Sequence, residues 1–172
     1  MKARIEIEGE NLEVDFSKGM DISIPLLFNG DQPNTYNVNK AISKAYKDGK
    51  FIGDTRKGGP CNFETYNFTP HCNGTHTECI GHITKERVSI LNSLEEEMIF
   101  SSLITIEPKR SAEQYIPELN PEDLVITKQQ LQAKLENIDS NFLQALIIRT
   151  LPNSEQKKER NYMKEPSSFF SI

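Results

Sequence analysis

Hydrophobic and polar residues alternate near the start of the chain, between residues 4 and 16. The apolar positions fall at every second residue in two runs separated by Gly9-Glu10-Asn11: Ile5, Ile7, Leu12, Val14 and Phe16. A period of two is the spacing of a strand with one buried face, and a short polar interruption with glycine is typical of a turn. The pattern predicts a β-hairpin, followed by a short strand at Asp21–Ile24 that Pro25 ends.

The middle of the chain predicts a helix and a strand, each preceded by a loop. Residues 29–37 and 53–62 are rich in Asn, Asp, Gly and Pro, as loops are. Between Val38 and Tyr46 the apolar residues recur at helical spacing, which favours a short helix. The alternating, aromatic stretch 63–69 predicts a strand.

The second half of the chain mixes predicted strands with a helix. Residues 98–106 are apolar and predict a buried strand. Thr127 and Gln130 fit a capping box at the start of a helix. The short apolar run Ala145–Ile148 predicts a central strand covered on both faces. We therefore expect an α/β or α+β fold with a mixed sheet, in a single domain over residues 1–172.

The last residues predict an element that has no room to continue. Pro166, Ser167 and Ser168 before two phenylalanines are typical of a loop and an N-cap that open a helix, but the chain stops at Ile172. A helix of one turn cannot stand alone. We therefore expect this polypeptide to lack its C-terminal part, as a fragment or because the remainder is a separate chain.

Composition narrows the class of protein. Charged residues make up 26% of the chain and the net charge is −5, which gives nucleic-acid binding no electrostatic support. No stretch approaches the roughly 20 apolar residues that span a bilayer, and residues 1–4 do not open a secretory signal. Three cysteines, an odd number, do not suggest a disulfide framework. We expect a cytoplasmic homo-oligomer that acts on a small-molecule substrate, with no nucleic-acid or membrane partner.

The strongest chemical signal lies in residues 71–82. This window holds all three histidines of the chain, two of its three cysteines and one glutamate: His71, His76, His82, Cys72, Cys79 and Glu78. These side chains bind transition metals and move protons near neutral pH. The window therefore predicts where the chemistry takes place.

Alternation within the window suggests a set of metal ligands. In an extended segment Cys72, His76 and Glu78 point to the same side, and all three residue types bind zinc. Three protein ligands leave a position for water, whose pKa a bound divalent ion lowers toward about 7. His82 lies just beyond these residues and is the candidate general acid or base.

Other interpretations of the same residues remain open. Cys72, His76, Cys79 and His82 could form a structural zinc site, although Asn73-Gly74-Thr75 disfavours the helix that this spacing needs. The histidines could instead satisfy polar groups in a core, and the cysteines could be small buried residues. Outside the window, Arg149 follows the apolar run and could point into the site or form a structural ion pair.

Around Gly74-Thr75-His76 the window resembles the signature of the cyclase family, which includes bacterial kynurenine formamidase. That signature runs H-x-G-T-H-x-D-x-P-x-H. Its second and last His match His76 and His82, and Glu78 stands at the Asp position. Cys72 occupies the first His position, with His71 one residue early, and Ile80 replaces the proline. The stretches 21–26 and 145–150 are similar to the opening and central strands of the family, so the resemblance covers most of the chain.

The resemblance implies a swivelling β/β/α fold and metal-dependent hydrolysis of a small amide, formamide or cyclic substrate, with metal-bound hydroxide attacking the carbonyl. It implies zinc or manganese held at the positions of Cys72, His76 and Glu78, and proton transfer by His82. Family members complete the metal site with a His and a Glu near the C-terminus, whereas no histidine follows His82 here. A metal-free relative that only binds a small molecule or a partner is the alternative.

Overall fold

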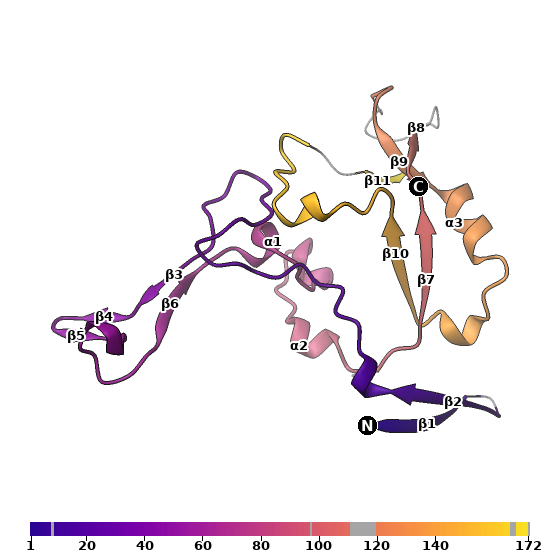
Figure 1. Cartoon of the computed structure of the whole chain (residues 1–172). Helices are drawn as coiled ribbons and strands as arrows, with labels where there is room; N and C mark the ends of the chain where they lie inside the picture. Colours follow the sequence, from indigo (N-terminus) through magenta and orange to yellow (C-terminus); the bar gives the residue numbers. More distant parts are fainter. Residues whose placement is uncertain (8, 97, 111–119, 166–167, 172) are drawn as a thin grey trace. The chain divides into compact units, whose positions relative to one another are not determined.

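The computed structural model describes residues 1–7, 9–96, 98–110, 120–165 and 168–171. These residues form a mixed α/β structure with several small sheets and few helices (Figure 1). The strands are β1 (Lys2–Ile7), β2 (Glu10–Asp15), β3 (Ile42–Ala45), β4 (Lys47–Asp48), β5 (Phe51–Ile52), β6 (Glu64–Asn67), β7 (Ser101–Ile106), β8 (Lys109–Arg110), β9 (Leu124–Thr127), β10 (Ala145–Thr150) and β11 (Phe169–Ser171). The helices are α1 (Pro70–Asn73), α2 (Ile90–Ser93) and α3 (Lys128–Leu135).

The chain divides into two compact units. Unit 1 comprises Met1–Ser23, Leu94–Pro152 and Ser168–Ile172, and unit 2 comprises Ile24–Ser93 and Asn153–Ser167. The expectation of one domain over residues 1–172 stays a prediction. Within the described ranges, no helix has the length and apolar character that crossing a bilayer requires.

Unit 1 begins with the predicted hairpin. β1 and β2 pair antiparallel, with Ile5 opposite Leu12 and Ala3 opposite Val14. Gly9 directly before β2 has φ +87°, a left-handed conformation that glycine adopts without strain. The alternating pattern and the turn glycine therefore predicted this element correctly.

The hydrophobic core of unit 1 is formed by residues of β7, β9, β10 and α3 and its surroundings. β7 and β10 form a parallel pair, and β9 pairs with β8 on one side and with β11 on the other. Buried isoleucines of β7 and β9 pack against partly buried apolar residues of α3 and its surroundings: Ile104, Ile106, Ile126, Leu131, Leu135, Ile138 and Ile148. The predicted capping box is confirmed, since the Thr127 hydroxyl accepts from the Gln130 N–H and the Gln130 side chain accepts from the Thr127 N–H.

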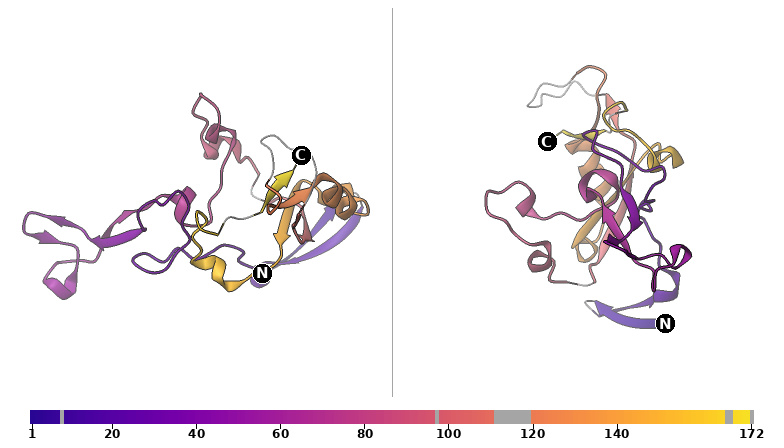
Figure 2. Two further views of the ribbon diagram at one scale, coloured as in Figure 1. Left: turned by 90° about the horizontal axis from the view of Figure 1, so that it is seen from above. Right: turned by 90° about the vertical axis from the view of Figure 1, so that its left-hand side faces the viewer.

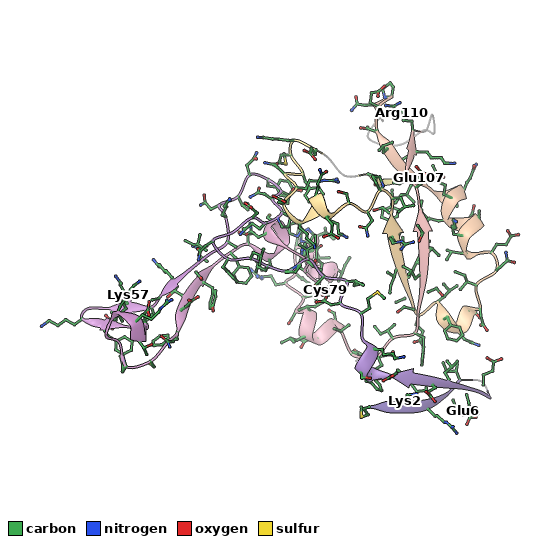
Figure 3. All side chains as sticks on the ribbon, in the orientation of Figure 1. Lys2, Glu6, Lys57, Cys79, Glu107 and Arg110 are labelled. Atoms are coloured by element: carbon green, nitrogen blue, oxygen red, sulfur yellow. The ribbon has the colours of Figure 1, made fainter. Side chains whose placement is uncertain are left out.

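Unit 2 contains a two-stranded ribbon that leads away from α1. β3 pairs antiparallel with β6, and the hairpin β4–β5 lies beyond it (Figures 1 and 2). Lys57 is labelled in this distal part of the ribbon in Figure 3, next to the buried Asp54. Hydrogen bonds from Arg56 hold the pKa of the Asp54 carboxyl at about 2. The Asp54 carboxylate therefore holds the turn after β5 through Arg56 and Lys57.

Two predicted elements of the first half are wrong. Where a helix was expected, Ile42–Ala45 forms β3, because the backbone of Ala41 is bonded elsewhere. The Ala41 N–H donates to Gln32 Oε1 at 2.5 Å, and its carbonyl accepts from the Asn29 N–H at 3.0 Å. Asp21–Ile24 is not a strand: the Asp21 carboxylate accepts from the Ser23 N–H at 2.8 Å, which closes a local turn.

Two predictions for the second half also need correction. The strand at Ala145–Ile148 is confirmed as part of β10, but in a two-stranded sheet Leu146 and Ile147 each remain 37% exposed, so it is not covered on both faces. Phe169–Ser171 pairs with β9 as the strand β11 where a helix was expected. Pro166, Ser167 and Ile172, on which that expectation also rested, lie outside the described residues.

Candidate metal centre

The histidine window begins with the single helical turn α1. Pro70 takes the first helical position, where its missing N–H costs nothing, and Gly74 follows the last turn. Cys72 and Asn73 are buried in this turn, whereas His71 is only half-buried. The turn therefore gives Cys72 and His71 different surroundings.

After α1, residues 75–79 have no regular secondary structure, and the chain then forms a turn. Ile80–His82 forms a 3₁₀ turn, in which the His82 N–H donates to the Cys79 carbonyl at 2.9 Å. A Cβ atom at Gly81 would lie 2.5 Å from the Val88 carbonyl oxygen, so only glycine permits this close approach. The tight return places His82 near Glu78. Cys79, in this part of the loop, is labelled in Figure 3.

All three imidazoles converge on the carboxylate of Glu78. His71 Nδ1 and His76 Nε2 each lie 2.6 Å from Glu78 Oε1, and His82 Nε2 lies 3.7 Å from Oε2. The His71 ring lies 4.6 Å from that of His82 and 4.7 Å from that of His76, between centroids. Residues 71–82 thus build one compact cluster from a single stretch of backbone.

Hydrogen bonds shift the pKa values of two groups in this cluster, His76 and Glu78. His76 Nδ1 donates to the Gly74 carbonyl at 3.0 Å, and this bond is the main reason that the pKa of His76 is raised; contact with Glu78 raises it further and partial burial opposes both. The pKa of Glu78 is lowered, first by the hydrogen bond from His76 and then by the neighbouring imidazoles. The carboxylate is therefore held in the charged form that a metal ion needs.

The donor set suits a divalent cation. One ligand atom each from His71, Glu78 and His82 lies within 4.8 Å of the other two. Imidazole nitrogens and a carboxylate oxygen are ligands of zinc, and the carboxylate also suits manganese. The Gly74 carbonyl fixes the His76 ring through Nδ1 and leaves Nε2 directed at Glu78, as outer partners of metal-bound histidines do.

The structure brings most of the candidate residues together, but not all. His76, Glu78 and His82 lie in the cluster, and so does His71, which was the second choice for the first ligand position. Cys72 is 8% exposed and is not in the group of neighbouring ligand atoms. The strand-like alternation that predicted Cys72 as a ligand does not hold at Cys72, because this residue lies in the helical turn α1. Arg149 belongs to unit 1, where its Nε donates to Thr105 Oγ1 at 3.0 Å.

Sequence reasoning missed Asn73, whose side-chain hydrogen bonds hold the turn α1 that carries His71. Asn73 is fully buried; its Oδ1 accepts from the Thr69 N–H at 2.9 Å and its Nδ2 donates to the Asn39 carbonyl at 3.4 Å. An asparagine beside a proline turn was the available signal, but its partner Asn39 lies far away in the sequence.

Asn73→Ala is expected to lower the free energy of unfolding by about 1–3 kcal/mol, because it leaves the Thr69 N–H without its acceptor. The same change should weaken metal binding, since it loosens the turn that carries His71. Urea denaturation and zinc titration measure the two effects. Asn92→Ala, at an exposed position of α2, is the matched control and should change neither.

Comparison with known proteins gives a family match. The model of a family described as "Putative cyclase" matches residues 14–170, a range that includes the whole histidine cluster. Searches of curated proteins and of solved structures returned no significant match.

Proposed function

Because this chain belongs to the cyclase family, whose model covers residues 14–170, we propose that it is a metal-dependent hydrolase of a small amide, formamide or cyclic substrate. The observation that carries the proposal is the convergence of three imidazoles on Glu78. In keeping with the family, we infer that its small sheets belong to a swivelling β/β/α fold.

We assign the metal ligands to His71, His76 and Glu78. The two imidazoles approach the same carboxylate oxygen at 2.6 Å, and the His76 ring is oriented by the Gly74 carbonyl. His71 contacts Glu78 whereas Cys72 is buried, which favours His71 over Cys72 as the first ligand. The neighbouring set His71, Glu78 and His82 is the alternative, and variants separate the two.

His82 suits a role in proton transfer. Its Nε2 is the most distant of the three imidazole nitrogens from Glu78, at 3.7 Å, and its side chain is 48% exposed, so the ring can exchange protons with water. A bound divalent ion would polarise a carbonyl and lower the pKa of its water. His82 Nε2 then has the position to give a proton to the departing nitrogen of an amide.

Metal content tests this assignment. The purified chain should hold about one zinc or manganese ion per chain by elemental analysis, and His71→Ala and His76→Ala should each lose it. Cys72→Ser should retain the metal, and His82→Gln should retain the metal but lose hydrolysis of an aryl formamide such as formanilide. Loss of metal in His82→Gln would instead favour the alternative ligand set.

Two outcomes would overturn the proposed function. A chain that purifies without metal and shows no thermal shift with zinc or manganese would be a non-catalytic relative. A chain that unfolds when a chelator removes its metal would be a structural zinc module. An enzyme should lose activity on chelation and keep its fold.

A further inference from the structure

A tyrosine from a distant loop lies beside the histidine cluster. The ring of Tyr36 is nearly parallel to that of His71, with an interplanar angle of 12° and 6.4 Å between centroids. This separation falls within the range of aromatic pairs. The two residues are far apart in the sequence, and both belong to unit 2.

The backbone at Tyr36 is in an unusual conformation. Tyr36 has φ +54° and Asn37 has φ +52°, so two consecutive residues other than glycine are left-handed. This conformation is uncommon for residues other than glycine, and asparagine tolerates it better than a bulky aromatic residue. Strain of this kind persists where surrounding contacts impose it, and it is common at functional sites.

Asn34 supplies the contacts that impose this turn. Its Nδ2 donates to the Val38 carbonyl at 2.8 Å, across the base of the turn. Its N–H donates to the Arg160 carbonyl at 3.0 Å, and its own carbonyl accepts from the Tyr162 N–H at 2.9 Å. The turn is therefore anchored on both sides, and the Tyr36 ring is carried by a supported backbone.

The Tyr36 ring is available to a ligand. The residue is 68% exposed, and among the described residues its hydroxyl has no hydrogen-bond partner. Tyr66, another exposed tyrosine of unit 2, instead packs against Phe28 with 4.8 Å between ring centroids. Tyr36 thus presents a flat apolar surface next to His71 that no described apolar side chain is shown to cover.

We propose that Tyr36 is a specificity-determining residue, which stacks against a planar group of the substrate while the substrate's carbonyl lies at the histidine cluster. This inference rests on the proposed function, because the cluster must first bind a metal ion. The ring, and not the hydroxyl, performs the role, since stacking needs only the aromatic face. Substrates with a flat conjugated group next to the scissile carbonyl are therefore preferred over aliphatic ones.

Two small chelating ligands test the proposal on the zinc-loaded 172-residue chain. Benzohydroxamate and acetohydroxamate have the same chelating group, and they differ by a phenyl ring in place of a methyl group. Wild type should bind benzohydroxamate about tenfold more tightly than acetohydroxamate, in the range expected when stacking adds to apolar burial. Calorimetric titration gives both dissociation constants without any catalytic readout.

The variants separate the ring from the backbone. Tyr36→Phe should retain the preference, whereas Tyr36→Asn, which suits the left-handed conformation, should lose it and bind zinc as tightly as wild type. Tyr66→Ala is the control and should keep the preference. If Tyr36→Asn lowers the affinity for zinc, or leaves the preference for benzohydroxamate unchanged, the role of Tyr36 is overturned and the proposed function is not. A wild-type chain that binds no zinc overturns the proposed function and this inference with it.

Discussion

Glu78→Gln is expected to lower the affinity for zinc by about 100-fold or more. Glutamine has the shape of glutamate, but its amide carries no charge and offers a neutral oxygen. Loss of an outer partner of a metal ligand already costs about 10–100-fold in affinity, so loss of the carboxylate that all three imidazoles approach should cost at least as much. Among single changes at the cluster, we expect the largest effect here.

Competition with a zinc-binding dye measures this affinity. Glu86→Gln removes an exposed carboxylate close by in the sequence and should leave the affinity unchanged. Equal affinity of Glu78→Gln and wild type would show that Glu78 is not a ligand. A fall in both variants would point to a general loss of negative charge.

The same variant should change the pH dependence of the metal-free protein. The pKa of His76 is raised in the folded chain from its ordinary value of 6.5. Protonation of His76 therefore stabilises the fold fully below pH 6.5, and this stabilisation is lost as pH rises through the raised pKa. Glu78→Gln should lower the pKa of His76 without restoring the ordinary value, because the bond to the Gly74 carbonyl remains. Titration of the His76 ring by NMR follows this shift.

Features that depend on neighbouring residues were predictable from the sequence. The hairpin of β1 and β2 follows from alternation and a turn glycine, and the start of α3 follows from the Thr127–Gln130 capping box. In both, the residues that form the hydrogen bonds are close together in the chain. Local pattern and final structure therefore agree.

Features that depend on distant partners were not predictable. The spacing from Val38 to Tyr46 favours a helix. The Gln32 side chain instead accepts a hydrogen bond from the Ala41 N–H, and β6 pairs with β3. Similarly, Phe169–Ser171 becomes a strand because the edge of β9 accepts it. Tertiary hydrogen bonds outweigh the weak local preference of such short segments.

The candidate site was predictable from the sequence only in part. Composition located the cluster, since the chain's histidines lie between residues 71 and 82. The helical turn at α1 then decided that His71, and not Cys72, contacts Glu78. Tyr36 joins the cluster through a loop, and nothing near it in the sequence indicates that proximity. Local sequence therefore predicts the residue types of the candidate site, and the tertiary fold decides which of these side chains meet.

Ile106→Ala is expected to lower the free energy of unfolding of unit 1 by about 2–5 kcal/mol, as measured by urea denaturation. Ile106 is 2% exposed and packs with Ile104 and Ile126, so its deletion removes apolar contacts and leaves a cavity. A loss of this size is a large fraction of the roughly 5–15 kcal/mol that stabilises a domain.

Leu103→Ala is the matched control for this change, because Leu103 lies in the same strand and is 60% exposed. Its deletion should alter stability by no more than about 0.5 kcal/mol. The difference between the two variants isolates burial from strand propensity, since both replace a large aliphatic side chain by alanine in β7. Equal effects would mean that α3 does not cover this face of the strand, and the isoleucine cluster would then not be the core of unit 1.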